Sequence, residues 1–387
     1  MSGGVALERI YLDHNASTPL CREARAAMLP LLEDAWGNPS SSHWAGRPAR
    51  EVLERARTRV ADFLGADPAM VVFTSGGSES NNAALKGVWA ARGRPGAKIV
   101  VSAIEHPAVL EPVRFLARQG ARVTLLPVDA TGRVDPGDLA AELARADAET
   151  ILVSVMQANN ETGTLQPVAE LARLARAAGA FFHTDAAQSA GKVPVDVAEI
   201  GCDLLSLAGH KLHGPKGVGA LYVRPGTPLE PLLHGAGHEA GRRAGTESAL
   251  LAAGLGAACA AAAAALPRMA EVSRLRETLW EALRRELGEG VALLGHPVER
   301  LPNTLYVGFR GTTGAELLAR CPGVAASTGA ACHGQGRQMS AVLRAMGVDP
   351  VWGEGAVRLS LGRGNSVEEV ARAATLLIEA ARVAGVH

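Results

Sequence analysis

Short apolar runs alternate with longer amphipathic segments over the first two thirds of the chain. The runs are rich in β-branched and aromatic residues, which predicts strands. They are VVFT, KIVVSA, RVTLLPV, TILVSVM, AFFHTD, DLLSLAG and GALYV. Helical spacing of apolar residues from Arg47, and helix starts near Ser78, Pro107, Leu139 and Pro167, predict the intervening helices. Strands separated mostly by helices predict an α/β fold whose mostly parallel, seven-stranded sheet has helices on both faces.

The pattern changes after Val223. A Gly-rich loop leads into an Ala-rich helix over residues 249–265, and Pro267 marks a hinge. The next amphipathic helix carries apolar residues at Leu275, Leu279, Leu283 and Leu287. A strand over Asn303–Phe309 and a closing strand and helix from Ala356 follow. We therefore expect a second, smaller α+β domain.

Composition narrows the class of protein. The 387 residues are 48% hydrophobic and 20% charged, which is typical of a soluble globular enzyme. Thirty-nine basic residues balance 39 acidic ones, so no excess charge favours nucleic acid or an anionic membrane as a partner. The five cysteines are scattered and form no CxxC pair, which favours a reducing compartment. We expect neither a signal peptide nor a membrane span, and a cytoplasmic location.

Lys211 is the first candidate for catalysis. It is one of only five lysines, and it lies in SLAGHKLHGPKGVGA, where a Gly-rich turn follows an apolar segment. A buried strand that carries a lysine into a partly desolvated pocket would lower its pKa and suit it to Schiff-base chemistry. The alternative is a surface turn with solvated lysines. The segment alone does not separate the two.

Polar residues follow several other predicted strands. Gly76, Gly77 and Ser78 lead from a strand into a helix, where backbone N–H groups and the helix dipole favour a phosphate; ordinary N-capping is the alternative. Asp185 ends another strand, where an acid pairs with a pyridinium nitrogen or caps a helix. Further strand ends are followed by polar residues at His106, Asn159 and Asn160. The histidines around Lys211 lack carboxylates at ligand spacing, so we expect no metal.

Cys332 differs from the other cysteines in its surroundings. It lies in STGAACHGQGRQ, a small, polar, Gly-rich segment that suits a reactive thiol on a loop. Cys202, Cys259 and Cys321 lie in apolar runs and are interpreted as packing residues. An incidental loop cysteine is the alternative for Cys332.

Because these motifs follow one another in a characteristic order, the chain resembles the cysteine desulfurases and the related selenocysteine lyases. These are pyridoxal-phosphate enzymes of the class-V aminotransferase group, fold type I. The resemblance covers nearly the whole chain and rests on LDHNASTP, WGNPSS, FTSGGSESNN, EHPAV, NNETG, HTDAAQ, GHKLHGPKGVGALYV, GTES, STGAACH and VRLSLGR. It implies a large cofactor-binding domain over residues 15–262. Residues 1–14 and 263–387 would form the small domain that carries the Cys332 loop.

The resemblance implies how pyridoxal 5'-phosphate is held. Lys211 would bind it covalently, His106 would stack on its ring, Asp185 would pair with the ring nitrogen and Gln188 would meet the phenolic oxygen. The phosphate-binding positions would be Gly77, Ser78 and His210. Thr246 would reach the phosphate of a second subunit, which implies a homodimer.

The resemblance also implies how the substrate is held and cleaved. The substrate-binding residues would be Asn15, Asn160 and Arg358, with Arg358 as a bidentate clamp on the carboxylate. Lys211, His106 and Cys332 would be the catalytic residues, with Cys332 accepting the sulfur of L-cysteine as a persulfide and leaving L-alanine. A sulfur-acceptor or scaffold protein, and a role in iron-sulfur cluster assembly, would follow.

Two departures keep a second substrate open. Ala208 replaces a serine that many desulfurases use at the phosphate, and the pair Cys332-His333 is similar to the selenocysteine lyases, whereas the loop from Cys332 to Ser340 has the length typical of the desulfurases. Release of selenide and L-alanine from L-selenocysteine is therefore the alternative function. A transaminase and a non-catalytic binding homologue are further alternatives, although the homologue is disfavoured because Lys211, Asp185 and Arg358 are all present.

Overall fold

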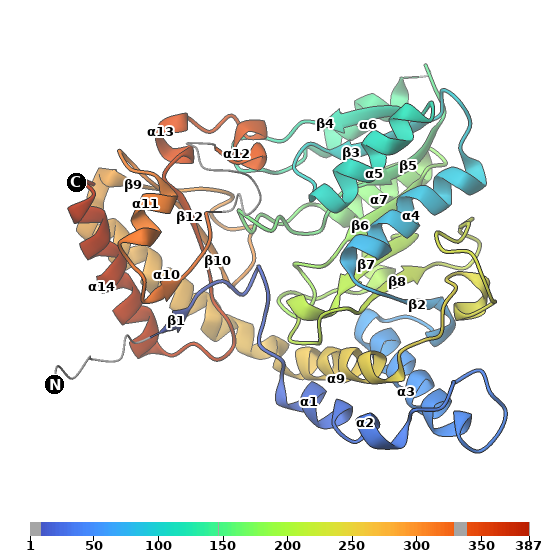
Figure 1. Ribbon diagram of the computed structural model, residues 1–387. Coiled ribbons are helices and arrows are strands. Elements are labelled where there is room, and N and C mark those ends of the chain that lie inside the picture. Colours follow the sequence, from blue (N-terminus) through green and yellow to red (C-terminus); the bar gives the residue numbers. More distant parts are fainter. Residues whose placement is uncertain (1–8, 146, 329–338, 387) are drawn as a thin grey trace.

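A seven-stranded sheet forms the larger part of the computed structural model, which describes residues 9–145, 147–328 and 339–386. The strand order is β2-β8-β7-β6-β5-β3-β4 (Figure 1). The strands are β2 (Val71–Thr74), β3 (Lys98–Ser102), β4 (Arg122–Leu126), β5 (Thr150–Ser154), β6 (Phe181–Asp185), β7 (Leu204–Ala208) and β8 (Gly219–Val223). Only β8 runs antiparallel to its neighbours, β2 and β7. The predicted α/β fold with a mostly parallel sheet is confirmed.

Helices cover both faces of this sheet because its strands are apolar on both sides. On β5, Leu152 packs in one core and Val153 in the other; on β7, Leu204 and Leu205 divide in the same way. The helices of this part are α1 (Arg22–Met28), α2 (Leu31–Asp34), α3 (Gly46–Leu64), α4 (Gly77–Arg92), α5 (Pro107–Arg118), α6 (Pro136–Ala144), α7 (Val168–Ala177), α8 (Val197–Ile200) and α9 (Ala249–Ala265).

Helix α9 has a composition that would also suit a membrane. Residues 249–266 contain no polar side chain, and the helical stretch Ala249–Gly290 is the one candidate span within the described ranges. An apolar run of membrane-spanning length therefore does occur. However, 56% of its most apolar window is buried, and Gly256 lies so close to α3 that an added Cβ would be 2.9 Å from Ala56. Close packing against α3 accounts for the small apolar residues of α9 as those of a core helix.

The smaller part has its own core. A three-stranded antiparallel sheet, in the order β12-β10-β9, packs against two long helices, α10 and α14. The elements are α10 (Met269–Leu287), β9 (Val291–Leu293), β10 (Thr304–Phe309), α11 (Gly314–Ala319), β11 (Val324–Ala325), α12 (Ala341–Ala345), α13 (Pro350–Gly353), β12 (Ala356–Ser360) and α14 (Val367–Val383). The sequence predicted α10, β10, β12 and α14 but not β9 or β11. The domain boundaries remain predictions.

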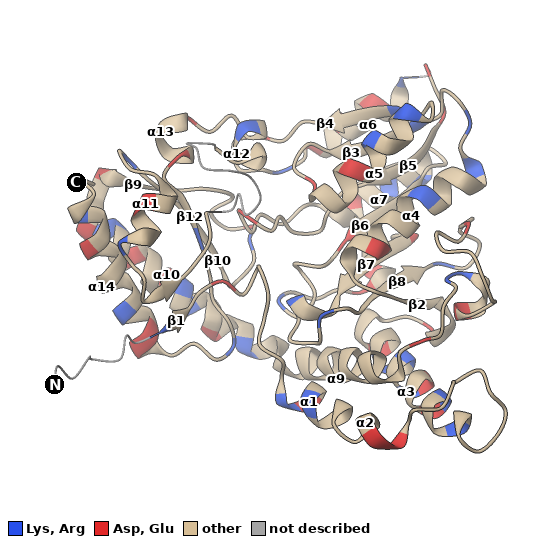
Figure 2. Ribbon diagram, in the orientation of Figure 1, with Lys and Arg blue, Asp and Glu red and all other residues tan. Residues whose placement is uncertain are grey.

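The N-terminal segment joins the two parts. Strand β1 (Ile10–Tyr11) pairs with β11 in the smaller part, and Asp13 forms a bridge with Ser360. A few residues later the backbone N–H of Thr18 donates to the carbonyl of His210, in the loop after β7. Residues 13–18 therefore cross between the parts. Acidic and basic residues are interspersed over both parts (Figure 2).

Candidate active site

Lys211 lies in a short 3-10 turn, Gly209–Lys211, directly after β7. Its Nζ donates to the carbonyl oxygens of Asn15, at 2.5 Å, and Ala16, at 3.0 Å, where the N-terminal segment crosses. Burial and then the charge of Arg358 lower the pKa of Lys211 to about 8, although Asp185 and Asp13 act in the opposite direction. A substantial fraction of this amine is therefore neutral and nucleophilic near neutral pH.

Asp185 ends β6 and is buried. Its Oδ2 accepts from the side-chain amide of Asn81, at 2.7 Å, and its Oδ1 accepts from the N–H of Ala187, at 2.9 Å. Asn81 belongs to α4, so these bonds tie the end of β6 to that helix. The carboxylate is held in place with lone pairs left to accept a further N–H.

The N-terminus of α4 carries no side-chain cap. The cap residue is Gly76, and no side chain of the described residues bonds to the N–H groups of the first turn; Glu79 instead accepts from the N–H of Ser75. A Cβ at Gly77 would be 3.3 Å from the Cβ of Ala208, so the glycine keeps this approach open. The capping alternative for Ser78 is not what the structure shows. The first-turn amides and the helix dipole suit an anion.

Two further residues predicted to contact the cofactor, His106 and His210, lie near Lys211. His106 caps α5 through its Nδ1, which accepts from the N–H of Ala108 at 3.1 Å, and its electrostatic neighbours are Asp185 and Lys211. Burial and then the charges of Lys211 and Lys216 lower the pKa of His210 to about 4, so its imidazole is neutral. Its Nδ1 lies 3.3 Å from the hydroxyl of Ser17.

Arg358 on β12 faces Lys211 from the smaller part. It is 4% exposed and donates to the carbonyl of Asn160, at 2.9 Å, and to Asp13 Oδ1, at 2.8 Å. Its Nε is buried and has no hydrogen-bond partner in the described ranges. The side-chain amide of Asn160 also has no hydrogen-bond partner among the described residues, and Arg358 bonds instead to the Asn160 main chain. A guanidinium with an unused N–H is suited to a second carboxylate.

Asn15 is buried within the site, and its role in binding substrate stays a prediction. Its side chain donates to Thr304 and to the main-chain carbonyl of Asn160, and it accepts from Asn303 and Lys192. Only its main-chain carbonyl reaches Lys211. The motif showed where Asn15 lies in the chain, but the direction of its side chain depends on residues almost 300 positions away.

Thr246 is a predicted residue that one chain does not bring to this site. Thr246 is exposed in the loop before α9 and bonds to none of the other predicted site residues in the described portion of the chain. Cys332 lies outside the described residues. Across residues 9–145, 147–328 and 339–386, no group of three or more His, Cys, Asp or Glu residues is arranged to hold a metal ion.

Sequence reasoning missed three residues of the site. Lys192 is buried and bonds to Gln188 and Asn15, Asp13 pairs with Arg358, and Asn81 holds Asp185. Lys192 had a weak signal, since it follows HTDAAQ within a run of small and apolar residues. Asp13 and Asn81 had none beyond being polar residues near motifs.

Comparison with known proteins agrees with this geometry. The chain matches the family described as Aminotransferase class-V over residues 10–373. It is 43% identical to "Cysteine desulfurase IscS" of Dictyoglomus turgidum, over 93% of this chain and 91% of the relative. A solved structure titled "NIFS-like protein" has a TM-score of 0.89 at 36% identity, covering 96% of this chain and 98% of its own. Another, titled "SspA in complex with cysteine", has a TM-score of 0.79 at 34% identity, with 91% and 98% covered.

The fold and the site define a class-V aminotransferase, and the chain belongs to that family. Within it, the chain belongs to the pyridoxal-phosphate-dependent cysteine desulfurases, as its motifs predicted. The residues present fit the cofactor. A partly neutral lysine suits its aldehyde, the uncapped α4 N-terminus beside Gly77 suits its phosphate, and Asp185 suits its ring nitrogen.

Proposed function

We propose that this chain converts L-cysteine and an enzyme thiol to L-alanine and an enzyme persulfide, with Cys332 as the thiol. The sulfur passes from the substrate Cβ to the Cys332 sulfur. The reaction balances because the Cys332 thiol loses one proton and the methyl group of alanine gains one hydrogen. The observation that carries the proposal is the partly neutral Lys211 amine within the electrostatic field of Arg358, whose Nε remains unused.

The side chains of the site divide the work. Pyridoxal phosphate, when bound, supplies a ring that withdraws electrons from the substrate α-carbon. The neutral Lys211 amine removes the proton from that carbon, because a pKa near 8 suits a base at neutral pH. Arg358 holds the substrate carboxylate through its unused N–H groups. The first-turn amides of α4 and the neutral His210 hold the phosphate.

The test is product analysis with a reductant present. Wild-type enzyme should release alanine and sulfide from cysteine in equal amounts. Cys332→Ala should form no alanine while keeping cofactor absorbance, and Lys211→Ala should lose both turnover and the absorbance of the lysine-bound cofactor. Alanine formation at the wild-type rate by Lys211→Ala would contradict the assignment.

Selenocysteine lyase activity is the second candidate, carried by Ala208 beside the phosphate-binding turn, where its Cβ would meet a Cβ at Gly77. A selenol leaves more readily than a thiol, so selenium release would depend less on Cys332. An enzyme that cleaves selenocysteine but not cysteine, and keeps that activity in Cys332→Ala, would establish it. Amino transfer to a keto acid without sulfide release would instead indicate a transaminase.

We also propose a homodimer. Trp36, Trp44 and Leu32 are exposed near α2, and the two indole rings are 6.2 Å apart in a T-shaped arrangement. Exposed apolar groups of this size favour a protein interface. Thr246 is exposed in the loop before α9, which supports a contact with a neighbouring subunit. Light scattering that gives the monomer mass at micromolar concentration would exclude the dimer.

The wider role follows from the chemistry of a persulfide. We propose that a separate protein takes the sulfur from Cys332, and that iron-sulfur cluster assembly is one destination. The four described cysteines, Cys21, Cys202, Cys259 and Cys321, are free thiols, which supports a reducing location such as the cytoplasm. Transfer of radioactive sulfur from the loaded enzyme to a purified scaffold protein tests this role.

A further inference from the structure

Lys192 is a buried lysine that the mechanism above does not use. It follows the turn after β6 and is 7% exposed. Its Nζ donates to Gln188 Oε1, at 2.8 Å, and to Asn15 Oδ1, at 3.0 Å. Neither partner is charged. Burial and then the charges of Lys211 and Arg358 lower the pKa of Lys192 well below its ordinary value.

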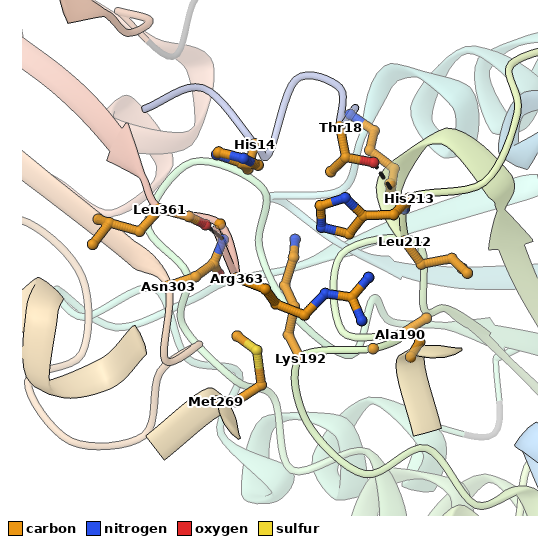
Figure 3. Close-up of a pocket in the computed structure, with 14 residues that line it drawn as sticks. His14, Thr18, Ala190, Lys192, Leu212, His213, Met269, Asn303, Leu361 and Arg363 are labelled. Atoms are coloured by element: carbon orange, nitrogen blue, oxygen red, sulfur yellow. Dashed lines mark hydrogen bonds between the residues drawn. The ribbon is translucent and has the colours of Figure 1, made fainter. Parts of the chain in front are cut away.

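The space around Lys192 combines polar side chains with apolar ones, among them Leu212 and Met269. A cavity of about 20 Å³, enough for one water molecule, is lined by Lys192, Lys211, His14, His213 and Arg363. Figure 3 shows the Lys192 side chain extending into this space beneath His14 and His213. Burial lowers the pKa of both histidines, to about 4 for His213, so no imidazolium faces the amine.

Lys192 and the main-chain carbonyl of Asn15 together fix how the Gln188 amide is turned, one at each end of the amide. An amide oxygen accepts and an amide nitrogen donates, so a lysine on one end of the amide selects the oxygen for that end. Gln188 Nε2 therefore points the other way and donates to the carbonyl of Asn15, at 2.9 Å. The same carbonyl accepts from Lys211 Nζ. The donor end of Gln188 thus lies beside the lysine nitrogen.

We propose that Lys192 is a positioning residue that holds Gln188 with its N–H groups toward the cofactor hydroxyl and so tunes the lysine-cofactor bond. In pyridoxal phosphate the ring hydroxyl is adjacent to the aldehyde, so an amide beside Lys211 Nζ would be able to donate to that hydroxyl when the cofactor is bound. A hydrogen bond to the ring oxygen withdraws electron density from it and makes the neighbouring lysine-cofactor nitrogen less basic. The inference rests on the proposed role of Lys211.

The test is a pH titration of cofactor absorbance in purified holoenzyme without substrate. Lys192→Met should raise the midpoint by about half to one pH unit, the effect of losing one hydrogen bond of ordinary strength. Gln188→Leu should raise it by a similar amount. Because Lys192 acts through Gln188, the double variant should match Gln188→Leu alone. Lys86→Met, on α4 away from the site, is the matched control and should leave the midpoint unchanged.

Three outcomes would overturn the inference. An unchanged midpoint in Lys192→Met would show that Lys192 does not act on the cofactor. Additive shifts in the double variant would show that Lys192 acts by its own charge and not through Gln188. If the Met variant does not fold, Lys192→Gln, which keeps an amide donor, should shift the midpoint in the same direction by less; no shift would contradict the proposal. Failure of the Lys211 role would appear separately, as a wild-type enzyme without lysine-bound cofactor absorbance.

Discussion

Two regions of this molecule bury lysines in opposite ways. On β3, at the far side of the sheet from β7, the Lys98 side chain is 2% exposed and its Nζ bonds to Glu142 and Asp147, each at 2.8 Å. Burial lowers its pKa, but hydrogen bonds to these two carboxylates outweigh burial and raise the pKa above its ordinary value. At the active site, Lys192 and Lys211 bond only to neutral oxygens, and their pKa values fall.

The difference separates structural charges from functional ones. A buried lysine with carboxylate partners is a permanent cation whose bonding capacity is used within the protein. A buried lysine without them stays partly neutral, and its nitrogen remains available for chemistry or for orienting a neighbour. Arg358 combines both kinds of contact. One of its N–H groups donates to the carboxylate of Asp13, and its Nε has no hydrogen-bond partner in the described ranges.

The largest expected effect is on Lys98, the buried lysine that has carboxylate partners. Lys98→Met should lower the free energy of unfolding by about 3 kcal/mol, because it leaves the buried Glu142 with only the exposed Arg145 as its cation. Urea unfolding at pH 7 measures this. Adding Glu142→Leu to Lys98→Met should recover most of the loss; a double variant no more stable than Lys98→Met would contradict the pairing.

The next largest expected effect is on Arg358, the residue proposed to hold the substrate carboxylate. Arg358→Lys keeps the positive charge but loses the planar pair of N–H groups that holds both oxygens of a carboxylate, so kcat/KM for cysteine should fall about 100-fold, or about 2.7 kcal/mol. Steady-state sulfide release measures it. Cofactor absorbance in the unreacted variant should match wild type, and a loss of cofactor instead of substrate affinity would place Arg358 in a different role.

Glu105 provides a test that depends on pH. Burial raises its pKa to about 8, although Ser102 and the N–H of Met156 donate to it. Between its ordinary pKa and about 8, the folded protein holds a proton that the unfolded chain has lost, so the stability of the folded state falls as pH rises through this window.

Glu105→Gln removes that proton linkage and keeps the accepting oxygen. The variant should match wild type at pH 5 and should be about 2 kcal/mol more stable at pH 6.5. Urea midpoints at the two pH values measure the difference. An equal change at both values would mean that Glu105 does not retain its proton.

The smallest expected effect is on Lys192, the buried lysine that has no carboxylate partner. Lys192→Met removes a buried amine that has no carboxylate partner, so the free energy of unfolding should fall by only about 1 kcal/mol, the cost of leaving Gln188 Oε1 without its donor. Asn15 Oδ1 still accepts from Asn303 in this variant. A loss as large as that of Lys98→Met would show that the two lysines do not differ as described.

Much of the fold was predictable because it depends on local pattern. β-branched runs predicted all seven strands of the large sheet, and apolar spacing predicted the helices between them. Strands β9 and β11 were missed because they are two or three residues long and form through partners distant in sequence. The apolar run of α9 was not recognised because the sequence does not say that α3 covers it.

The candidate site was predictable only as far as motifs reach. Lys211, Asp185 and Gly77 stand at strand ends and helix starts, which place them at one edge of the sheet. The inward turn of Asn15 and the contact of Lys192 with Gln188 are set by packing between the two parts of the molecule. No local sequence signal encodes such contacts, so the roles of these two residues emerge only from the structure.

The central claim is that Lys211, and not the more deeply buried Lys192, holds the cofactor. Borohydride reduction of holoenzyme fixes the cofactor to the lysine that carries it, and peptide mass spectrometry then identifies that lysine. The account predicts the pyridoxyl mass on the peptide containing Lys211 and an unmodified Lys192. Modification of Lys192 in wild-type enzyme would contradict it.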